Sequence, residues 1–241
     1  GERPTDENLQ KGKAAVGKAQ QQNSLTDKEK AYINAVAHFY ENWENTSYAD
    51  QLKAFEAGYK QAHEAYPDEV EAAAFYALGQ LGTAPKTDKT FAKQKEAGAL
   101  LEQLHAKNPD HPGLFHYIIH AYDNPLLATK AVNVSREYER IAPDVPHALH
   151  MPSHIFVRLG QWTDAVDWNI RSADAALRQS PKDVVSMHYP HALDYMAYGY
   201  LQQGQDKKAQ AVVEKLEAAA GYTPTFATAY ALAAIPARQA L

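Results

Sequence analysis

The stretch Pro146-His147-Ala148-Leu149 recurs 44 residues later as Pro190-His191-Ala192-Leu193. Each copy is followed, eleven residues after its leucine, by a glycine, and five residues after that glycine by an alanine: Gly160 and Ala165, then Gly204 and Ala209. A short word followed by small residues in a fixed register is typical of an internal repeat, and repeats determine the architecture of the chain that carries them. The sequence therefore predicts a protein built by stacking one structural unit.

The repeated unit is helical. Good helix formers (Ala, Glu, Lys, Gln, Leu) dominate the chain, and no stretch alternates in the manner of a strand. Proline ends a helix, and an acidic residue after it suits the N-terminus of the next one. Four such stops recur, at Pro67-Asp68, Pro109-Asp110, Pro143-Asp144 and Pro181 with Asp183. We predict an all-α fold of about twelve helices of 12–20 residues.

The spacing of these stops agrees with a known repeat. The gaps between the four prolines are 42, 34 and 38 residues, and 34 residues is the period of the tetratricopeptide repeat (TPR), a helix–turn–helix unit. Gly160 and Gly204 are expected to close the first helix of a pair in the left-handed conformation, with Asp164 and Asp206 capping or charging the start of the second helix. Residues 47–220 thus resemble TPR proteins, which implies a right-handed α-solenoid of antiparallel helix pairs.

The first 45 residues do not match this repeat. They predict two helices, the second of which begins with the capping-box pattern of Thr26 and Glu29. We interpret residues 1–45 as an N-terminal helical pair, either a cap or the remnant of a longer superhelix, and residues 46–241 as TPR-like repeats. Within the repeats, Gly82–Asp88 is expected to be an inserted loop.

Composition excludes several classes of function. The net charge of -5 and pI of about 6.1 give no overall basic field for nucleic acid, and no apolar run approaches the length of a membrane span. The chain has no cysteine, so disulfides and thiolate metal sites are excluded. This absence favours a periplasmic or secreted location over the cytoplasm, although it also fits the cytosol. The abrupt opening, without a signal peptide, is expected of a mature form or of a fragment.

Histidine is concentrated in the repeats, where eight of the eleven histidines lie between residues 111 and 191. In a solenoid, the first helices of neighbouring repeats lie side by side and line the concave surface. Helical spacing places the histidines of each first helix on one face. We therefore predict a His-rich concave face at 111–194, whose metal-ligand candidates are His116, His120, His147, His150, His154 and His191.

Several imidazoles within reach of one point would bind a transition metal such as Zn, Cu, Ni or Fe through neutral ring nitrogens. The nearest carboxylates, as ligands or as acceptors behind the histidines, are Asp123, Asp144 and Asp194. Asp194 occupies the register position that His150 has one repeat earlier. Because aspartate, like histidine, can bind a metal ion, this position still offers a metal ligand. The residues expected to contact a ligand in the groove are Arg158, Asp194, Tyr117 and Tyr195.

Pro152 falls inside an expected 14-residue helix that carries His150 and His154. Proline removes a helical hydrogen bond and frees the carbonyl of Ala148. Two outcomes are open: a kink that reorients the two histidines, or a helix that begins at Pro152.

Two His-rich segments, residues 111–121 and 147–155, together with Tyr189-Pro190-His191, resemble a bacterial subgroup of TPR proteins that bears this signature. The resemblance implies a fold and a shared site but no particular reaction. At Asp194, where that signature has a further histidine, this chain departs from it. The sequence also lacks HExxH, a glycine-rich phosphate loop, GxSxG and a thiol nucleophile, so we expect no nucleotide cofactor.

Three functions are compatible with these residues. The first is a binding scaffold whose His- and Tyr-lined groove holds a peptide or a small molecule, with a His-bound transition metal. The second is an enzyme in which that metal activates water or oxygen. The third is a protein–protein interaction scaffold in which the histidines only form hydrogen bonds. The sequence leaves the oligomeric state, and whether the chain is an enzyme, open.

Overall fold

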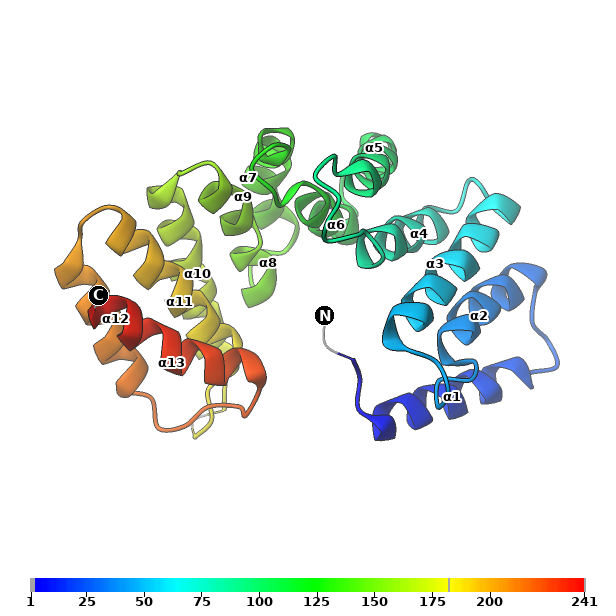
Figure 1. The fold of residues 1–241 in the computed structure, drawn as a ribbon, viewed down its shortest axis with the longest axis horizontal. Helices are drawn as coiled ribbons and strands as arrows, with labels where there is room; N and C mark the ends of the chain where they lie inside the picture. The colour runs from blue at the N-terminus through cyan, green and yellow to red at the C-terminus, as the bar shows by residue number, and fades with distance from the viewer. Residues whose placement is uncertain (1–2, 182, 241) are drawn as a thin grey trace. The chain divides into compact units, whose positions relative to one another are not determined.

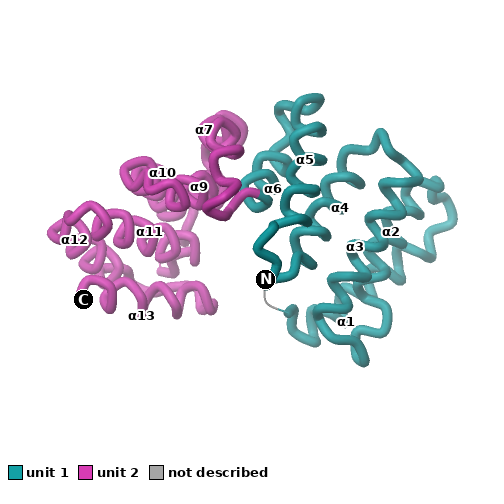
Figure 2. Tube along the Cα trace, turned by 45° about the horizontal axis from the view of Figure 1, so that its top comes forward, with its two compact units in different colours: residues 1–121 teal, residues 122–241 magenta. Residues whose placement is uncertain are grey.

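The computed structural model describes residues 3–181 and 183–240, and the described chain is helical apart from its connections and one isolated bridge (Figure 1). Its contacts group into two compact units, residues 1–121 and 122–241 (Figure 2). The first contains α1 (Asp6–Gln20), α2 (Asp27–Tyr40), α3 (Tyr48–Ala65), α4 (Val70–Gly82), α5 (Ala92–Lys107) and α6 (Pro112–Tyr122), which ends at the boundary. The second contains η1 (Ala128–Ala131), α7 (Val132–Ile141), α8 (Pro146–His150), α9 (Pro152–Arg158), α10 (Trp162–Gln179), α11 (His188–Gln202), α12 (Asp206–Glu217) and α13 (Phe226–Ala240).

The expected stops end four helices. The prolines at 67, 109, 143 and 181 each follow the last residue of α3, α5, α7 and α10 by two positions. The capping box at the start of α2 is also confirmed: Thr26 accepts from the backbone of Glu29, whose carboxylate accepts from the backbone of Thr26 in return. Gly82 ends α4, and the expected loop lies between it and α5.

The two glycines of the repeated turn adopt the same conformation. Gly160 has φ of 68° and Gly204 has φ of 65°, in the left-handed region that costs other residues energy. Each turn closes its helix with two backbone bonds, the Schellman pattern. These run from Gly160 to Val157 and from Gln161 to Phe156, and from Gly204 to Leu201 and from Gln205 to Tyr200. Asp164 and Asp206 lie in the first turns of α10 and α12, where a negative charge favours the helix N-terminus, and Asp164 also accepts from Arg136 of α7 at 2.8 Å.

Within the C-terminal unit, helices pack as antiparallel pairs. The interrupted helix α8–α9 packs on α10, α10 packs on α11, and α11 packs on both α12 and α13 (Figure 1). Alanines allow close approach: Ala165 and Ala209, the small residues in register, are both fully buried. The first helices of successive pairs are therefore α8–α9, α11 and α13.

Pro152 divides the expected long helix into α8 and α9. The backbone amide of His154 bonds to the carbonyl of Met151, at 3.1 Å, instead of reaching back to His150. The hydroxyl of Ser153 donates to the His150 carbonyl at 2.6 Å and so satisfies the acceptor that the helix leaves open. A helix does begin at Pro152, as one of the two predicted outcomes, while Met151 keeps helical dihedrals between α8 and α9.

In the N-terminal unit, α1 to α5 pack each on the next. Helices α2, α3 and α4 meet in a buried cluster around Tyr59. The division of the chain into residues 1–45 and 46–241 remains a prediction. In the described part of the chain, no helix is both long and apolar enough to cross a bilayer.

Candidate functional site

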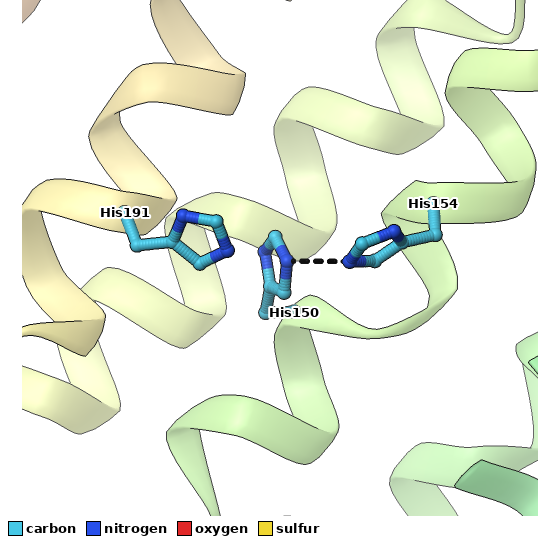
Figure 3. A group of neighbouring side chains, drawn as sticks. All are labelled: His150, His154 and His191. Atoms are coloured by element: carbon cyan, nitrogen blue, oxygen red, sulfur yellow. Dashed lines mark hydrogen bonds between the residues drawn. The ribbon is translucent and has the colours of Figure 1, made fainter. Parts of the chain in front are cut away.

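Three imidazoles meet in the C-terminal unit. His150 at the end of α8, His154 in α9 and His191 in α11 each offer a ring nitrogen, and these atoms lie within 4.8 Å of one another. His150 stands between the other two (Figure 3). Its ring centroid is 4.3 Å from that of His191, and its Nε2 atom is 3.0 Å from the Nε2 atom of His154. We call these three residues the histidine triad.

The ring of His150 is oriented by a residue of the neighbouring helix. Its Nδ1 atom lies 2.8 Å from the side-chain oxygen of Asn169, which is fully buried in α10. The amide nitrogen of Asn169 donates to the carbonyl of Ala165 at 2.7 Å, and this contact fixes which end of the amide faces the ring. Because an amide oxygen only accepts, the hydrogen must be on Nδ1 of His150. The Nε2 atom of neutral His150 therefore carries a lone pair.

His154 is held in the same tautomer. Its Nδ1 atom lies 3.0 Å from one carboxylate oxygen of Asp123, and Arg158 donates through Nε to the other oxygen at 2.7 Å. Burial by itself raises the pKa of Asp123, but the hydrogen bonds and charges of His154 and Arg158 outweigh it and lower the pKa below the ordinary value. Asp123 is thus an ionised acceptor, and Nδ1 of His154 is the donor.

Two rings of the triad, those of His150 and His191, resist protonation. Burial, followed by the charges of His154 and His191, lowers the pKa of His150 well below its ordinary value; this side chain is only 2% exposed. Burial and the neighbouring His154 and His188 lower the pKa of His191 to about 4. Near neutral pH these rings are electron-pair donors, the form in which histidine binds metals.

A cavity of about 470 Å³ opens beside the triad, within the C-terminal unit. Its walls come from the first helices α9, α11 and α13 and from the segment after α6. The lining residues are Asp123, His154, Val157, Arg158, His191, Asp194, Tyr195, Tyr198, Phe226, Ala227, Tyr230 and Arg238. Cavities of this size hold small organic molecules.

The other candidates predicted from the sequence lie in different places. His147 stacks on His150 with ring centroids 6.0 Å apart and on His188 at 5.5 Å, so it lies behind the triad. His116 and His120 belong to α6, in the N-terminal unit, where their Nε2 atoms are 3.0 Å apart and Tyr117 lies edge-on to His116. These two histidines contact each other, and their sharing of the triad's site remains a prediction.

The predicted carboxylates also differ in their surroundings. Asp123 supports His154 as described above. Asp194 is paired with Arg238 of α13, while burial raises its pKa and Arg238 opposes that shift. Asp144 lies apart, with its side chain 84% exposed, and its nearest cation is Arg178 at 4.0 Å. Tyr195 and Arg158 both line the cavity, and the Tyr195 ring packs edge-on against His150 with centroids 4.6 Å apart.

Sequence reasoning missed Asn169 and the contribution of α13. A buried asparagine among the alanines of α10 was a usable signal, since a polar side chain on the inward stripe of a helix requires a partner. Arg238 gave no such signal, because its pairing with Asp194 spans 44 residues and depends on the packing of α13.

Comparison with known proteins gives the fold. The chain matches no family model and no curated protein. Among solved structures, it is similar to MamA MSR-1 C2, a TPR-like protein, with a TM-score of 0.56 and 15% identity over 78% of this chain and 93% of that one. The fold is TPR-like. At this identity the similarity extends to the arrangement of helices and not to the site.

Proposed function

We propose that this chain is a helical-repeat binding protein whose C-terminal unit holds a divalent transition metal at the histidine triad, with a ligand received in the adjoining cavity. One observation carries the proposal: the Nε2 atoms of His150 and His154 face each other at 3.0 Å while both Nδ1 atoms face oxygen acceptors. Two lone pairs at this distance repel unless a cation, either a proton or a metal ion, lies between them.

The distance suits a metal. At a bond length near 2.05 Å, two nitrogens at one ion lie about 2.9 Å apart for a right angle and about 3.4 Å apart for a tetrahedral one. His150 and His154 already meet this requirement. The 4.8 Å limit of the whole triad implies that the most distant nitrogens approach by up to about 1.4 Å around a tetrahedral ion.

The alternative is a shared proton on an otherwise metal-free cluster. It places a positive charge where His150 is fully enclosed and where burial lowers the pKa of both His150 and His191. A divalent metal ion brings a larger charge than a proton, but it also gains three nitrogen ligands, which a proton cannot do, and this favours the metal. The carboxylate–histidine contact of Asp123 is of the type that supports metal-bound histidines.

The cavity also favours a second function. Three protein ligands with an open fourth position are typical of catalytic rather than structural zinc sites. His154 and His191 both line the cavity, so an open position would face it. A metal-dependent enzyme that activates bound water is therefore the second candidate.

The decisive test is calorimetric titration of zinc into untagged protein stripped with a chelator, together with the melting temperature. We expect one zinc per chain at the triad and a rise in the melting temperature. His154→Gln is expected to weaken zinc binding by roughly 100-fold or more, because it removes a direct ligand. His63→Gln, which removes an imidazole of α3 in the other unit, serves as the matched control.

Two results would overturn the metal proposal. One is the absence of a tight zinc site in the untagged protein. The other is equal zinc affinity in the His154→Gln and His63→Gln variants. The two functions are separated by the cobalt-loaded protein: a spectrum insensitive to pH and to added anions shows a closed coordination shell and excludes the enzyme.

A further inference from the structure

The cavity beside the triad has two chemical halves, and the inference drawn from them rests on the proposed metal site. One half is polar and contains His154, His191 and Arg158. The other half is mainly aromatic, with Tyr198 from α11 and with Phe226 and Tyr230 from α13, and the paired Arg238 and Asp194 lie beside these rings. A molecule that fills both halves needs a polar head for the first and a flat apolar body for the second.

The charged groups that line the cavity determine whether the polar head of the ligand is positive or negative. Asp123 faces Arg158 and Asp194 faces Arg238, so these four groups cancel in pairs. Three neutral imidazoles leave the full charge of a divalent metal uncompensated inside the unit. A buried charge is costly unless it is paired, so the open position favours an anionic donor.

Arg158 is placed to bind the same anion. Asp123 engages its Nε atom, whereas its terminal amino groups make no hydrogen bond to any described residue. The side chain is 43% exposed and lines the cavity four residues after His154 in the chain, on the same side of α9. A guanidinium with two donors available binds a carboxylate in a fixed geometry.

Arg238 is less available for this role. It donates both to Asp194 and to the hydroxyl of Tyr230, and its guanidinium stands 5.5 Å from the centre of the Tyr198 ring. These contacts anchor α13 over α11 and hold the aromatic wall in place. Arg238 is therefore a positioning residue of the cavity, and Arg158 is its anion-binding residue.

We propose that the cavity binds a carboxylate with an aromatic or bulky apolar body, with one carboxylate oxygen on the metal and the other at Arg158. Two sources share this chemistry: a free aromatic acid and the C-terminus of a peptide that ends in an aromatic residue. Both fit a cavity of about 470 Å³.

Titration of benzoate and of its neutral analogue benzamide into zinc-loaded full-length protein tests the proposal. We expect benzoate to bind at least about tenfold more tightly than benzamide, and this preference to disappear in the chelated protein. Equal binding of the two, or absence of binding by both, overturns the carboxylate proposal while zinc binding itself stays intact. Failure of zinc to bind overturns the proposed function instead.

Two variants test the two halves separately. Arg158→Gln is expected to weaken benzoate binding about tenfold or more, whereas Arg178→Gln, an exposed arginine of α10, leaves it unchanged. Phe226→Ala removes a ring of the aromatic half and is expected to weaken benzoate several-fold without changing the affinity for acetate. If benzoate binds Arg158→Gln and Phe226→Ala as tightly as it binds the parent, the assignment of the two halves is wrong.

The source of the carboxylate is distinguished with N-acetyl-Ala-Phe and its C-terminal amide. Tighter binding of the free peptide acid than of benzoate, with loss in the amide, assigns the cavity to peptide C-termini. Binding of benzoate without binding of the peptide acid assigns it to free aromatic acids. Either result supports the shared chemistry.

Discussion

The two copies of the repeated word adopt related folds but have different chemistry. In register, the first copy has His150, Pro152 and Asn169 where the second has Asp194, Met196 and Val213. The first copy forms an interrupted helix with an oriented imidazole, and the second forms the continuous helix α11 with a partly enclosed ion pair. At this register position, one repeat scaffold thus presents an imidazole of the histidine triad in one copy and an ion-paired carboxylate in the next, and the difference lies in a few inward-facing side chains.

The largest effect on zinc affinity is expected when Asn169, which supports the His150 ring in the first copy, is replaced by valine, the residue that the second copy has at this position. Asn169→Val leaves the Nδ1 hydrogen of His150 without its acceptor and frees the tautomer. We expect zinc affinity to fall by roughly 10- to 100-fold, as for other residues that support a ligating histidine. Calorimetric titration measures this, and unchanged affinity would show that Asn169 does not orient the ligand.

Acid stability tests His191, the second copy's member of the triad. Burial and the neighbouring His154 and His188 lower its pKa to about 4 in the folded chain, against about 6.5 when it is unfolded. The unfolded state therefore binds the proton first, and the stability present above pH 6.5 is lost as pH falls toward 4, by roughly 2–3 kcal/mol.

Denaturant unfolding of chelated protein at several pH values measures this loss. The other ionisable groups that face or flank His191 are His150, Asp194 and Tyr195, and they remain in place in His191→Gln. We expect this variant to lose less stability between pH 6.5 and 4 than the parent does. An identical pH profile would assign the acid sensitivity to other groups.

Breaking the second copy's anchor is expected to affect stability and not the metal. Asp194→Asn leaves Arg238 without its partner, at a cost of about 1–3 kcal/mol, because this pair is only partly enclosed. The free energy of unfolding should fall while zinc affinity stays within about threefold of the parent. A large loss of zinc binding would make Asp194 a ligand, in agreement with its predicted role.

Replacing Pro152, which interrupts the helix of the first copy, is expected to have a smaller effect on zinc affinity. Pro152→Ala restores a backbone donor and favours a continuous helix, as in α11. Because His150 and His154 lie on either side of the break, their mutual placement changes, and we expect zinc affinity to fall about tenfold. Equal affinity would show that the rings adjust independently of the backbone.

The smallest effect is expected on stability, from replacing the left-handed glycine that both copies have in their turn. Gly160→Ala and Gly204→Ala each force a Cβ into the left-handed conformation, and each should cost about 1 kcal/mol. Neither Cβ would meet an atom closer than 3.9 Å, so the two costs should be alike. Gly17→Ala in α1 is the control, since a Cβ there meets open space and should stabilise the helix. Thermal unfolding of the three variants measures the difference.

Local rules were sufficient to predict most of the fold. Proline stops, the capping box of Thr26 and the two left-handed glycines depend on neighbours in the sequence, so they can be read from it directly. The expected lengths of 12–20 residues are wrong for α6 to α9, which are 5–11 residues long. Pro152 explains the short α8 and α9, and η1 precedes the short α7.

The site was predictable only in part. The repeat register brings His150 and His191 together, since first helices of consecutive pairs are neighbours. The support of His154 by Asp123 spans 31 residues and that of His150 by Asn169 spans 19. Contacts of this kind depend on side-chain rotamers and helix rotation, which the histidine spacing does not specify.

The fixed amide of Asn169 has a consequence for recognising similar sites in other chains. A repeat protein could preserve every imidazole of the pattern and still leave the ring of its central histidine free to flip, if valine or leucine stood behind it. Histidine spacing alone would then group competent and incompetent sites together. The residue that distinguishes them is an asparagine 19 positions after that histidine, on the helix that supports its ring.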